Sequence, residues 1–219
     1  MAGEVKSGTV VISKASTKVD NEAPLEIKNK EKFVSRGGHK LDGALDEFSV
    51  DATDKVCLDV GSSTGGFTDC LLQRGATRVH AIDVGTNQLV WKLRNDERVI
   101  VKEQFNARYL TPEDLGEPID LMVTDVSFIS LTKILPASIS CMKTGGEMVC
   151  LIKPQFELER EDIPKGGVIK DEALRMKAVE KIKNFVLEAP RVEWQGYAPS
   201  KLTGTEGNQE YLAYLKVIE

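Results

Sequence analysis

The sequence has few of the residues that several classes of protein require. It contains two histidines, His39 and His80, so a histidine-based zinc site is not expected, and we predict no bound metal. Its four cysteines include no Cys-x-x-Cys pair and mostly fall in apolar segments, as reduced core thiols do. No apolar run approaches the ~20 residues of a membrane-spanning helix, and the first ten residues lack the apolar core of a signal peptide. We therefore expect a cytoplasmic protein with no membrane partner.

Charge is distributed unevenly along the chain. The net charge is −5, yet residues 1–40 hold eight lysines and arginines against five acidic residues, an excess of +3, and the remaining 179 residues carry −8. A basic arm on an acidic body indicates a localised contact with a polyanion. A solvated basic tail without a partner has the same composition, so both interpretations stay open at this point.

Residues 1–30 and 31–219 differ in pattern, and we expect them to form two domains. Residues 1–30 alternate short β-like runs, 9–12 and 24–27, with turn-forming residues, and they are too few to bury a core of their own. They predict a small β-rich segment from which residues upstream are missing. The rest of the chain is long enough for one substantial α/β domain.

Strand-like and helix-like segments alternate from residue 31 onward. Apolar periodicity predicts helices over 37–48, 67–73, 130–142 and 171–188, and strands over 56–60, 79–82, 99–101, 121–123 and 148–152. This alternation predicts an α/β fold, doubly wound, with a mostly parallel sheet and helices on both faces. Pro136 is expected to distort the third helix, which a glycine pair at 145–146 would end. Residues 155–169, polar and rich in proline and glycine, predict a mobile loop at the substrate side.

Residues 56–85 have the pattern of a nucleoside-binding half-site. An apolar strand ends at Asp59, a glycine-rich turn and an amphipathic helix follow, and a second apolar strand ends at Asp83. The two acids stand 24 residues apart, close to the roughly 20 residues expected for a ribose-binding carboxylate in such a unit. The glycines of the turn, which let backbone N–H groups approach a ligand closely, are Gly61, Gly65 and Gly66. This spacing fits either a dinucleotide or S-adenosylmethionine.

The residues of the turn favour S-adenosylmethionine. The dinucleotide fingerprint Gly-x-Gly-x-x-Gly places its glycines against a pyrophosphate, whereas residues 61–66 read GSSTGG and follow shortly after Asp59. A carboxylate there repels phosphate, but it can bind the ammonium group of a methionine moiety directly or through water. Two more β-like runs, 194–198 and 210–217, would add a terminal pair of strands, which fits the seven-stranded sheet of methyltransferases better than a dinucleotide-binding sheet. A nucleotide ligand, or a unit without a ligand, is the alternative.

Four further chemical groups lie at or beside the carboxyl ends of predicted strands, where an open α/β sheet places its site. Asp125 ends the fourth strand, Lys153 ends the fifth, and Glu210 opens the last. Lys40 lies on the helix that leads into the main domain. Each of these residues alone is more often a solvated surface group, so the prediction of a catalytic site depends on the set.

Together these segments resemble the FtsJ-like ribose methyltransferases, and specifically their TlyA/hemolysin-A branch, over roughly residues 33–219. The segments that carry the resemblance are, in order, FVSRGGHKLDGAL, CLDVGSSTGGFTDCLLQRGA, AIDVGTNQLVWKLR, NAR at 106–108, DLMVTDVSFISL, LIKPQFE, KGGVIKD and TGTEGNQEYL. The resemblance implies a Rossmann-like class I methyltransferase fold with a seven-stranded sheet. It also implies transfer of a methyl group from S-adenosyl-L-methionine to a ribose 2′-hydroxyl of ribosomal RNA, at cytidines in this branch.

The family has a Lys-Asp-Lys-Glu tetrad, which maps onto Lys40, Asp125, Lys153 and Glu210. A ribose hydroxyl is a weak nucleophile, so the enzyme must align oxygen, carbon and sulfur and remove one proton. Lys153 is the best candidate for the general base, because a like charge from Lys40 and partial burial both favour its neutral amine. Asp125 would orient Lys153 and the methionine end of the cofactor, and Glu210 would fix Lys40 or the ribose.

The resemblance also implies cofactor contacts and a partner. The expected cofactor-binding residues are Asp59, Gly61, Ser62, Gly65, Gly66, Phe67, Asp83, Val84, Asn106 and Asp125. Asn106 is placed near the adenine because the loop after the third strand lies there in the family. Members carry an amino-terminal RNA-binding domain of the kind found in a ribosomal small-subunit protein, and residues 1–28 resemble only its later β part, without its two helices. The expected partner is ribosomal RNA or a ribosomal subunit.

Three alternatives compete with this interpretation. The hemolysin name of the branch suggests a membrane-active cytolysin, but the sequence has no spanning helix, amphipathic insertion segment or strand set of sufficient length for a pore. A catalytically inactive RNA-binding module would need neither the tetrad nor the cofactor turn. A small-molecule methyltransferase fits the fold, but the pair of Lys153 and Lys40 is better suited to an alcohol beside a phosphate backbone.

Overall fold

The computed structural model describes residues 5–12, 14, 16–27, 31–204 and 206–219, and it divides into two units, Met1–Lys32 and Phe33–Glu219. The first unit contains a small antiparallel sheet of order β2-β1-β3, formed by β1 (Val5–Ser7), β2 (Val10–Ile12) and β3 (Leu25–Ile27). The runs at 9–12 and 24–27 predicted β2 and β3, whereas β1 was not predicted. The side chains of Val10, Val11 and Leu25 are exposed, so this sheet buries little apolar surface.

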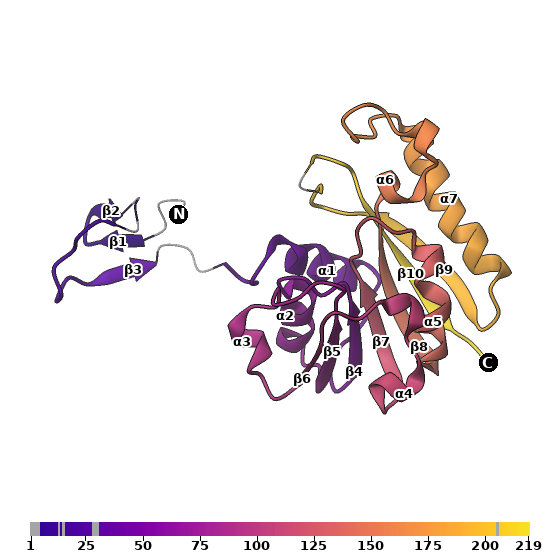
Figure 1. Ribbon diagram of the computed structural model, residues 1–219, viewed down its shortest axis with the longest axis horizontal. Coiled ribbons are helices and arrows are strands. Elements are labelled where there is room, and N and C mark those ends of the chain that lie inside the picture. Colours follow the sequence, from indigo (N-terminus) through magenta and orange to yellow (C-terminus); the bar gives the residue numbers. More distant parts are fainter. Residues whose placement is uncertain (1–4, 13, 15, 28–30, 205) are drawn as a thin grey trace. The chain divides into compact units, whose positions relative to one another are not determined.

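The second unit is built on a seven-stranded sheet of order β6-β5-β4-β7-β8-β10-β9 (Figure 1). The strands are β4 (Val56–Val60), β5 (Arg78–Ile82), β6 (Val99–Lys102), β7 (Ile119–Thr124), β8 (Met142–Ile152), β9 (Val192–Pro199) and β10 (Tyr211–Val217). Strands β4 to β8 pair with one another in parallel, and β10 runs antiparallel to both β8 and β9. The predicted α/β class with a mostly parallel, seven-stranded methyltransferase sheet is therefore confirmed, including the terminal strand pair.

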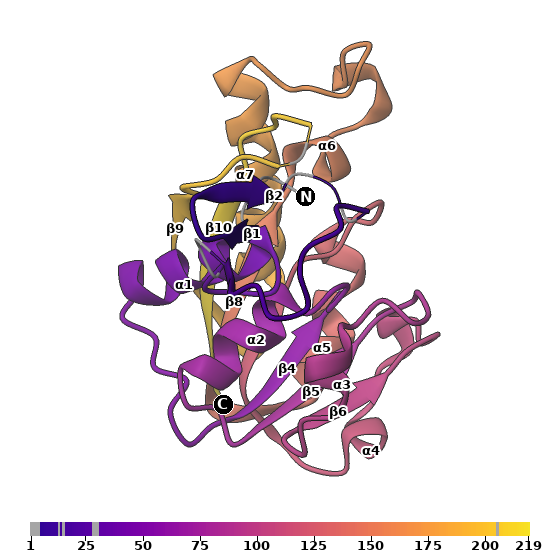
Figure 2. The same ribbon diagram turned by 90° about the vertical axis from the view of Figure 1, so that its left-hand side faces the viewer.

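Helices cover both faces of this sheet (Figure 1, Figure 2). They are α1 (Arg36–Glu47), α2 (Gly66–Gln73), α3 (Trp91–Arg94), α4 (Pro112–Leu115), α5 (Leu135–Ser140), α6 (Pro154–Glu157) and α7 (Glu172–Glu188). Short 3₁₀ helices span Ala107–Tyr109, Leu131–Lys133 and Arg160–Asp162. No helix in the described part of the chain has the length and apolar character that crossing a bilayer requires.

The sheet separates two cores because successive side chains of a strand point to opposite faces. Leu58, Met122 and Met148 stand in register across β4, β7 and β8 and pack with residues of α5 and α7. Cys57 and Leu121, their neighbours along the same strands, pack on the other face with residues of α1 and α2. All five side chains are fully buried, so both faces of the sheet are covered by packed apolar residues.

The predicted helix over 130–142 is confirmed only in part, because the helical residues there form two shorter elements. A 3₁₀ helix ends at Lys133, α5 begins at Leu135 and ends at Ser140, and strand β8 begins at Met142. Pro136 lies in the first turn of α5, where its missing N–H costs no hydrogen bond, and so it helps to start this helix. The glycine pair at 145–146, expected to end the helix, lies inside β8, where the register against β7 shifts near its start.

The segment 155–169 contains more structure than the loop predicted there. It begins inside α6 and includes the 3₁₀ helix Arg160–Asp162. Its end is bound by Asn208, a fully buried residue whose Nδ2 donates to the carbonyl of Gly167 over 2.9 Å and whose Oδ1 accepts from the N–H of Ile169 over 2.8 Å. These bonds connect it to the segment that joins β9 to β10.

Candidate active site

Backbone hydrogen bonds close the glycine turn between β4 and α2. The N–H groups of Gly61 and Ser62 both donate to the carbonyl of Ile82 at the end of β5, over 2.8 and 3.1 Å. Gly61 has a φ of +84°, and a Cβ added there would lie 2.7 Å from the carbonyl oxygen of Asp125. Any side chain at residue 61 would therefore displace the segment that follows β7. The turn brings the carboxyl ends of β4, β5 and β7 together.

Asp59 lies fully buried beneath this turn, with one carboxylate oxygen unpaired. Oδ2 accepts a hydrogen bond from Thr68 Oγ1 over 2.6 Å, whereas Oδ1 has no hydrogen-bond partner among the described residues. Burial raises the pKa of Asp59 to about 7; the Thr68 hydrogen bond opposes this shift, and the charges of Asp125 and Asp83 add to it. An unpaired, buried acid is unfavourable for stability and typical of functional sites.

Asp83 directly follows β5 and holds the turn with both carboxylate oxygens. Oδ2 accepts from the N–H of Ser63 over 2.8 Å, and Oδ1 accepts from the N–H of Gly85 over 2.7 Å. The residue also lines a cavity of about 410 Å³, which we call the Asp83 cavity. Other residues of its wall are Gly61, Val84, Asn106, Asp125 and Phe128. Most of the surface of this cavity is apolar, and its polar wall residues besides this acid include Asn106, Asp125 and Ser127.

A second cavity, of about 560 Å³, is lined by all four residues of the predicted tetrad, and we call it the lysine cavity. Lys40 comes from α1, Asp125 follows β7, Lys153 follows β8, and Glu210 precedes β10. The two cavities share the wall residues Gly61, Ser63, Asp125 and Ser127. Parallel strands place their carboxyl ends at one edge of the sheet, which explains why residues distant in sequence meet here.

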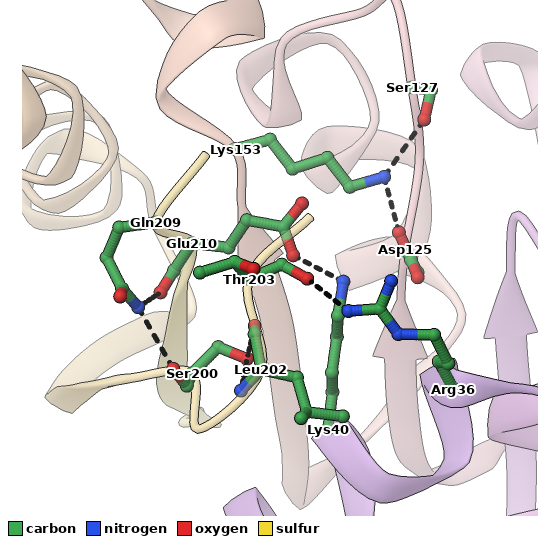
Figure 3. A network of polar contacts seen from close by, with 10 residues as sticks. All are labelled: Arg36, Lys40, Asp125, Ser127, Lys153, Ser200, Leu202, Thr203, Gln209 and Glu210. Carbon is green, nitrogen blue, oxygen red and sulfur yellow. Dashed lines mark hydrogen bonds and ion pairs between the residues drawn. The ribbon is translucent and has the colours of Figure 1, made fainter. Parts of the chain in front are cut away.

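The tetrad forms two ion pairs (Figure 3). Lys153 Nζ lies 2.5 Å from Asp125 Oδ1, without the alignment of a hydrogen bond, and it donates a hydrogen bond to Ser127 Oγ over 2.9 Å. Lys40 Nζ donates to Glu210 Oε2 over 2.5 Å, and their side chains are 9% and 3% exposed. The charge of Lys40 is therefore compensated by Glu210.

The segment between β9 and β10 closes the lysine cavity. Arg36 Nη2 donates to the carbonyl of Thr203 over 3.0 Å (Figure 3). A Cβ added to Gly204 would lie 2.6 Å from Glu210 Oε1, so this segment packs closely against the acid. Gln209 Nε2 donates to the backbone carbonyl of Glu210 over 2.9 Å. These contacts hold Glu210 toward Lys40.

The structure distributes the predicted cofactor residues over the two cavities. Gly61, Ser62, Gly66, Phe67 and Asp125 line the lysine cavity, and Gly61, Asp83, Val84, Asn106 and Asp125 line the Asp83 cavity. Asp59 and Gly65 line neither. Gly65 precedes α2 with a φ of +99°, and a Cβ there would lie 2.3 Å from Leu93 Cδ1, so this glycine shapes the turn from behind.

Sequence reasoning missed several residues of the site. Ser127 and Phe128 were not singled out, although both follow Asp125 within the segment DVSF. Phe128 is 91% exposed, has a φ of +64°, and its ring centroid lies 5.0 Å from that of Phe156. A positive φ is unfavourable for an aromatic residue, so the surrounding segment must hold it there. The spacing of Ser127, two residues after Asp125, was the available signal.

Comparison with solved structures gives the class of fold. An O-methyltransferase from Bacillus cereus, solved in complex with S-adenosylhomocysteine, matches 86% of this chain and 84% of its own with a TM-score of 0.58 and 13% identity. At that identity the match supports the fold alone. A putative hemolysin from Streptococcus thermophilus matches the whole chain and 80% of its own, with a TM-score of 0.85 and 42% identity. The architecture is that of a methyltransferase.

The chain belongs to the FtsJ-like methyltransferase family, whose model matches residues 33–217. It is 43% identical over 219 residues to the 16S/23S rRNA (cytidine-2′-O)-methyltransferase TlyA of Mycobacterium tuberculosis, covering 98% of this chain and 81% of that protein. It is 44% identical to hemolysin A of Brachyspira hyodysenteriae, covering 98% and 89%. The resemblance inferred from the sequence segments is thus confirmed, and the chain is a methyltransferase.

Substitution of Asp83 by alanine is expected to weaken binding of S-adenosylhomocysteine by about 1–3 kcal/mol, because a ligand hydroxyl loses its acceptor and the N–H groups of Ser63 and Gly85 lose theirs. Calorimetric titration measures this, and Asp83→Asn, which keeps one acceptor oxygen, should lose less. Equal affinity of Asp83→Ala and the unaltered protein would mean that the ligand ribose binds elsewhere.

Proposed function

We propose that this chain transfers a methyl group from S-adenosylmethionine to the ribose 2′-hydroxyl of a cytidine in ribosomal RNA. The observation that carries the proposal is the pairing of Lys153 with Asp125 and of Lys40 with Glu210 around one cavity beside the glycine turn. The names of the TlyA relatives, which specify 16S/23S or 23S rRNA and cytidine 2′-O-methylation, support the substrate.

The residues present fit S-adenosylmethionine. Asp59 Oδ1 and Ser62 Oγ are buried polar atoms without partners among the described residues, and both belong to the segment that forms the glycine turn. Buried polar atoms are normally paired. Ser62, on the wall of the lysine cavity, can contact a polar ligand group such as the ammonium of the methionine end directly, and Asp59, which lines neither cavity, can do so through water. The largely apolar Asp83 cavity, which has Asp83 just after β5 and Asp125 on its wall, fits an adenosine whose ribose hydroxyls bind Asp83.

We assign the chemical roles as follows. When bound, S-adenosylmethionine supplies an electrophilic methyl group and the positive charge of its sulfonium. Lys153 removes the proton of the ribose hydroxyl with its neutral amine, while the oxygen–carbon bond forms and the carbon–sulfur bond breaks. Asp125 orients Lys153 through the ion pair between them. Ser127 accepts a hydrogen bond from Lys153 and so fixes the direction of its Nζ.

Lys40 and Glu210 hold the acceptor ribose. Their ion pair is nearly buried on the wall of the lysine cavity, and it keeps one lysine donor and one carboxylate acceptor at a fixed separation. A ribose hydroxyl can both donate and accept, so it matches such a pair. The exposed ring of Phe128, on the wall of the Asp83 cavity next to Ser127, offers a surface on which a nucleotide base can stack.

The substrate class is tested with labelled S-adenosylmethionine and four acceptors: 16S rRNA, 23S rRNA, intact ribosomal subunits and a transfer RNA mixture. We expect the label in ribosomal RNA, free or in subunits, and at least tenfold less in transfer RNA. Equal or greater transfer to transfer RNA, or transfer to none of the four acceptors with normal binding of S-adenosylhomocysteine, would contradict the proposed substrate. Hemolysis by the purified chain would favour the alternative that the name of the Brachyspira relative suggests.

A further inference from the structure

Glu157 is a buried acid next to the site to which the proposed mechanism gives no role. It ends α6, four residues after Lys153, and its side chain turns into the protein instead of toward solvent, since the residue is 2% exposed. Burial raises the pKa of Glu157, and hydrogen bonds from Ser130 and Leu131 oppose that shift. A buried acid is unfavourable unless its contacts are specific.

The contacts of Glu157 join the segment that follows β8 to the segment that follows β7. Its Oε2 accepts from Ser130 Oγ over 2.5 Å, and its Oε1 accepts from the backbone N–H of Leu131 over 2.8 Å. Both donors lie in the segment that starts at Asp125, whereas the acid lies in the segment that starts at Lys153. Lys181 of α7 also donates to the carbonyl of Glu157, which fixes the backbone of α6.

The two segments run side by side and touch at three levels. Lys153 contacts Asp125 and Ser127 at the level of the cavity. One level farther along, the rings of Phe128 and Phe156 pack at 5.0 Å. The bonds between Glu157 and residues 130–131 form the third level, where Glu157 and Leu131 are buried and Ser130 is half-buried.

We propose that Glu157 is a positioning residue for methyl transfer: by binding Ser130 and Leu131 it holds the segment after β7 against α6, so that Asp125 and Ser127 meet Lys153 in the reactive arrangement. The inference rests on the function proposed above. Glu157 touches neither cavity, so it acts through other residues. The positive φ of Phe128 fits this role, because a strained residue needs an anchor on each side, and β7 and Glu157 supply them.

Two variants distinguish the positioning role of the Glu157 side chain from the effect of its charge. Glu157→Ala removes both acceptors. Glu157→Gln keeps a carbonyl oxygen for the N–H of Leu131 and an amide that can donate to Ser130 Oγ, so it retains the link without the charge. The matched control is Glu147→Ala, which removes another carboxylate with two partners, Lys55 and Tyr214, from a site in β8 that lines neither cavity.

The first measurement does not depend on activity. Hydrogen exchange is followed at the Leu131 amide and in a peptide covering residues 125–131. We expect at least tenfold faster exchange in Glu157→Ala, little change in Glu157→Gln, and no change there in Glu147→Ala. Unchanged exchange in Glu157→Ala would overturn the proposed link.

The second measurement is single-turnover methyl transfer to ribosomal RNA, scaled to the binding-competent fraction from the stoichiometry of S-adenosylhomocysteine titration. We expect the scaled rate of Glu157→Ala to fall at least tenfold with less than threefold change in the affinity for S-adenosylhomocysteine, and Glu157→Gln to recover most of the rate. A scaled rate equal to that of the unaltered protein would reduce Glu157 to a stabilising residue and overturn the proposal. Faster exchange in Glu157→Ala together with no transfer by the unaltered protein would refute the proposed function and leave the link intact.

Discussion

Lys153→Arg is expected to lose methyl transfer while it still binds S-adenosylmethionine. Arginine keeps the positive charge and can still pair with Asp125. Its guanidinium does not lose a proton in the pH range in which the enzyme works, so it cannot act as a base. Loss of a general base lowers the rate by about 10²–10⁴-fold. Lys153→Ala should fail equally. Single-turnover rates at saturating donor and RNA measure the effect, and calorimetry checks that donor affinity changes little.

Lys55→Arg is the matched control for Lys153→Arg. Lys55 Nζ also lies 2.5 Å from a carboxylate, that of Glu147, but neither residue lines a cavity of the site. We expect this variant to keep full activity. If Lys153→Arg retained more than about a tenth of the rate, Lys153 would serve as an electrostatic clamp, since loss of a true base costs at least ~100-fold, and another group would have to remove the proton.

Asp59→Asn is expected to make the protein more stable at pH 8 and less able to bind its donor. The pKa of Asp59 is raised to about 7 from its ordinary value of 3.8, so between these values the folded state holds a proton that the unfolded state has released. The contribution of Asp59 to the free energy of unfolding therefore falls as the pH rises from about 4 to about 7, by at most roughly 4 kcal/mol, and stays low above pH 7.

Asparagine mimics the protonated acid and can still accept from Thr68, so the variant should gain roughly 1–3 kcal/mol in urea unfolding at pH 8 and almost nothing at pH 4. The neutral amide no longer attracts an ammonium group, and donor affinity should fall by about 10- to 100-fold at pH 8. A stability gain without loss of donor affinity would show that Asp59 has no contact with the donor.

Asp120→Asn is the control variant, for which we expect a change in stability opposite in sign to that of Asp59→Asn. Burial acts to raise the pKa of Asp120, but hydrogen bonds from Lys143 Nζ and from the N–H of Val56 outweigh it, and the pKa is lowered. An acid of this kind stabilises the fold above the unfolded-state pKa and loses that contribution as the pH falls. Asp120→Asn should therefore be destabilised at pH 8, with a smaller difference at low pH, and should bind the donor normally.

Much of the fold was predictable because its signals are local. The apolar runs that became β4, β5 and β7 are short, end in acids or glycine and need no knowledge of their neighbours. The prediction of one continuous helix over 130–142 failed because the apolar spacing fits a helix throughout, whereas Pro136 restricts where a helix can begin. The start of β8 at Met142 depends on pairing with β7, which local spacing does not encode.

The site was predictable only in part, for a related reason. The tetrad was predicted from the order of the segments that resemble the family. The structure places its four members around one cavity. The contacts between Arg36 and Thr203 and between Glu157 and Ser130 join residues 167 and 27 positions apart, and nothing in the local pattern marks them. Likewise, the unpaired oxygen of Asp59 is a product of burial beneath the turn, so the sequence could indicate the acid but not its raised pKa.

The position of the transferred methyl group tests the central claim most directly. Ribosomal RNA is incubated with the protein and with S-adenosylmethionine that carries a trideuterated methyl group, then hydrolysed with alkali and analysed by mass spectrometry. Alkaline cleavage requires a free 2′-hydroxyl, so a 2′-O-methylated nucleotide survives in a dinucleotide. We predict a deuterium-labelled, alkali-resistant dinucleotide that begins with cytidine and is absent with Lys153→Arg. Label recovered only in mononucleotides, on the base, would contradict the account.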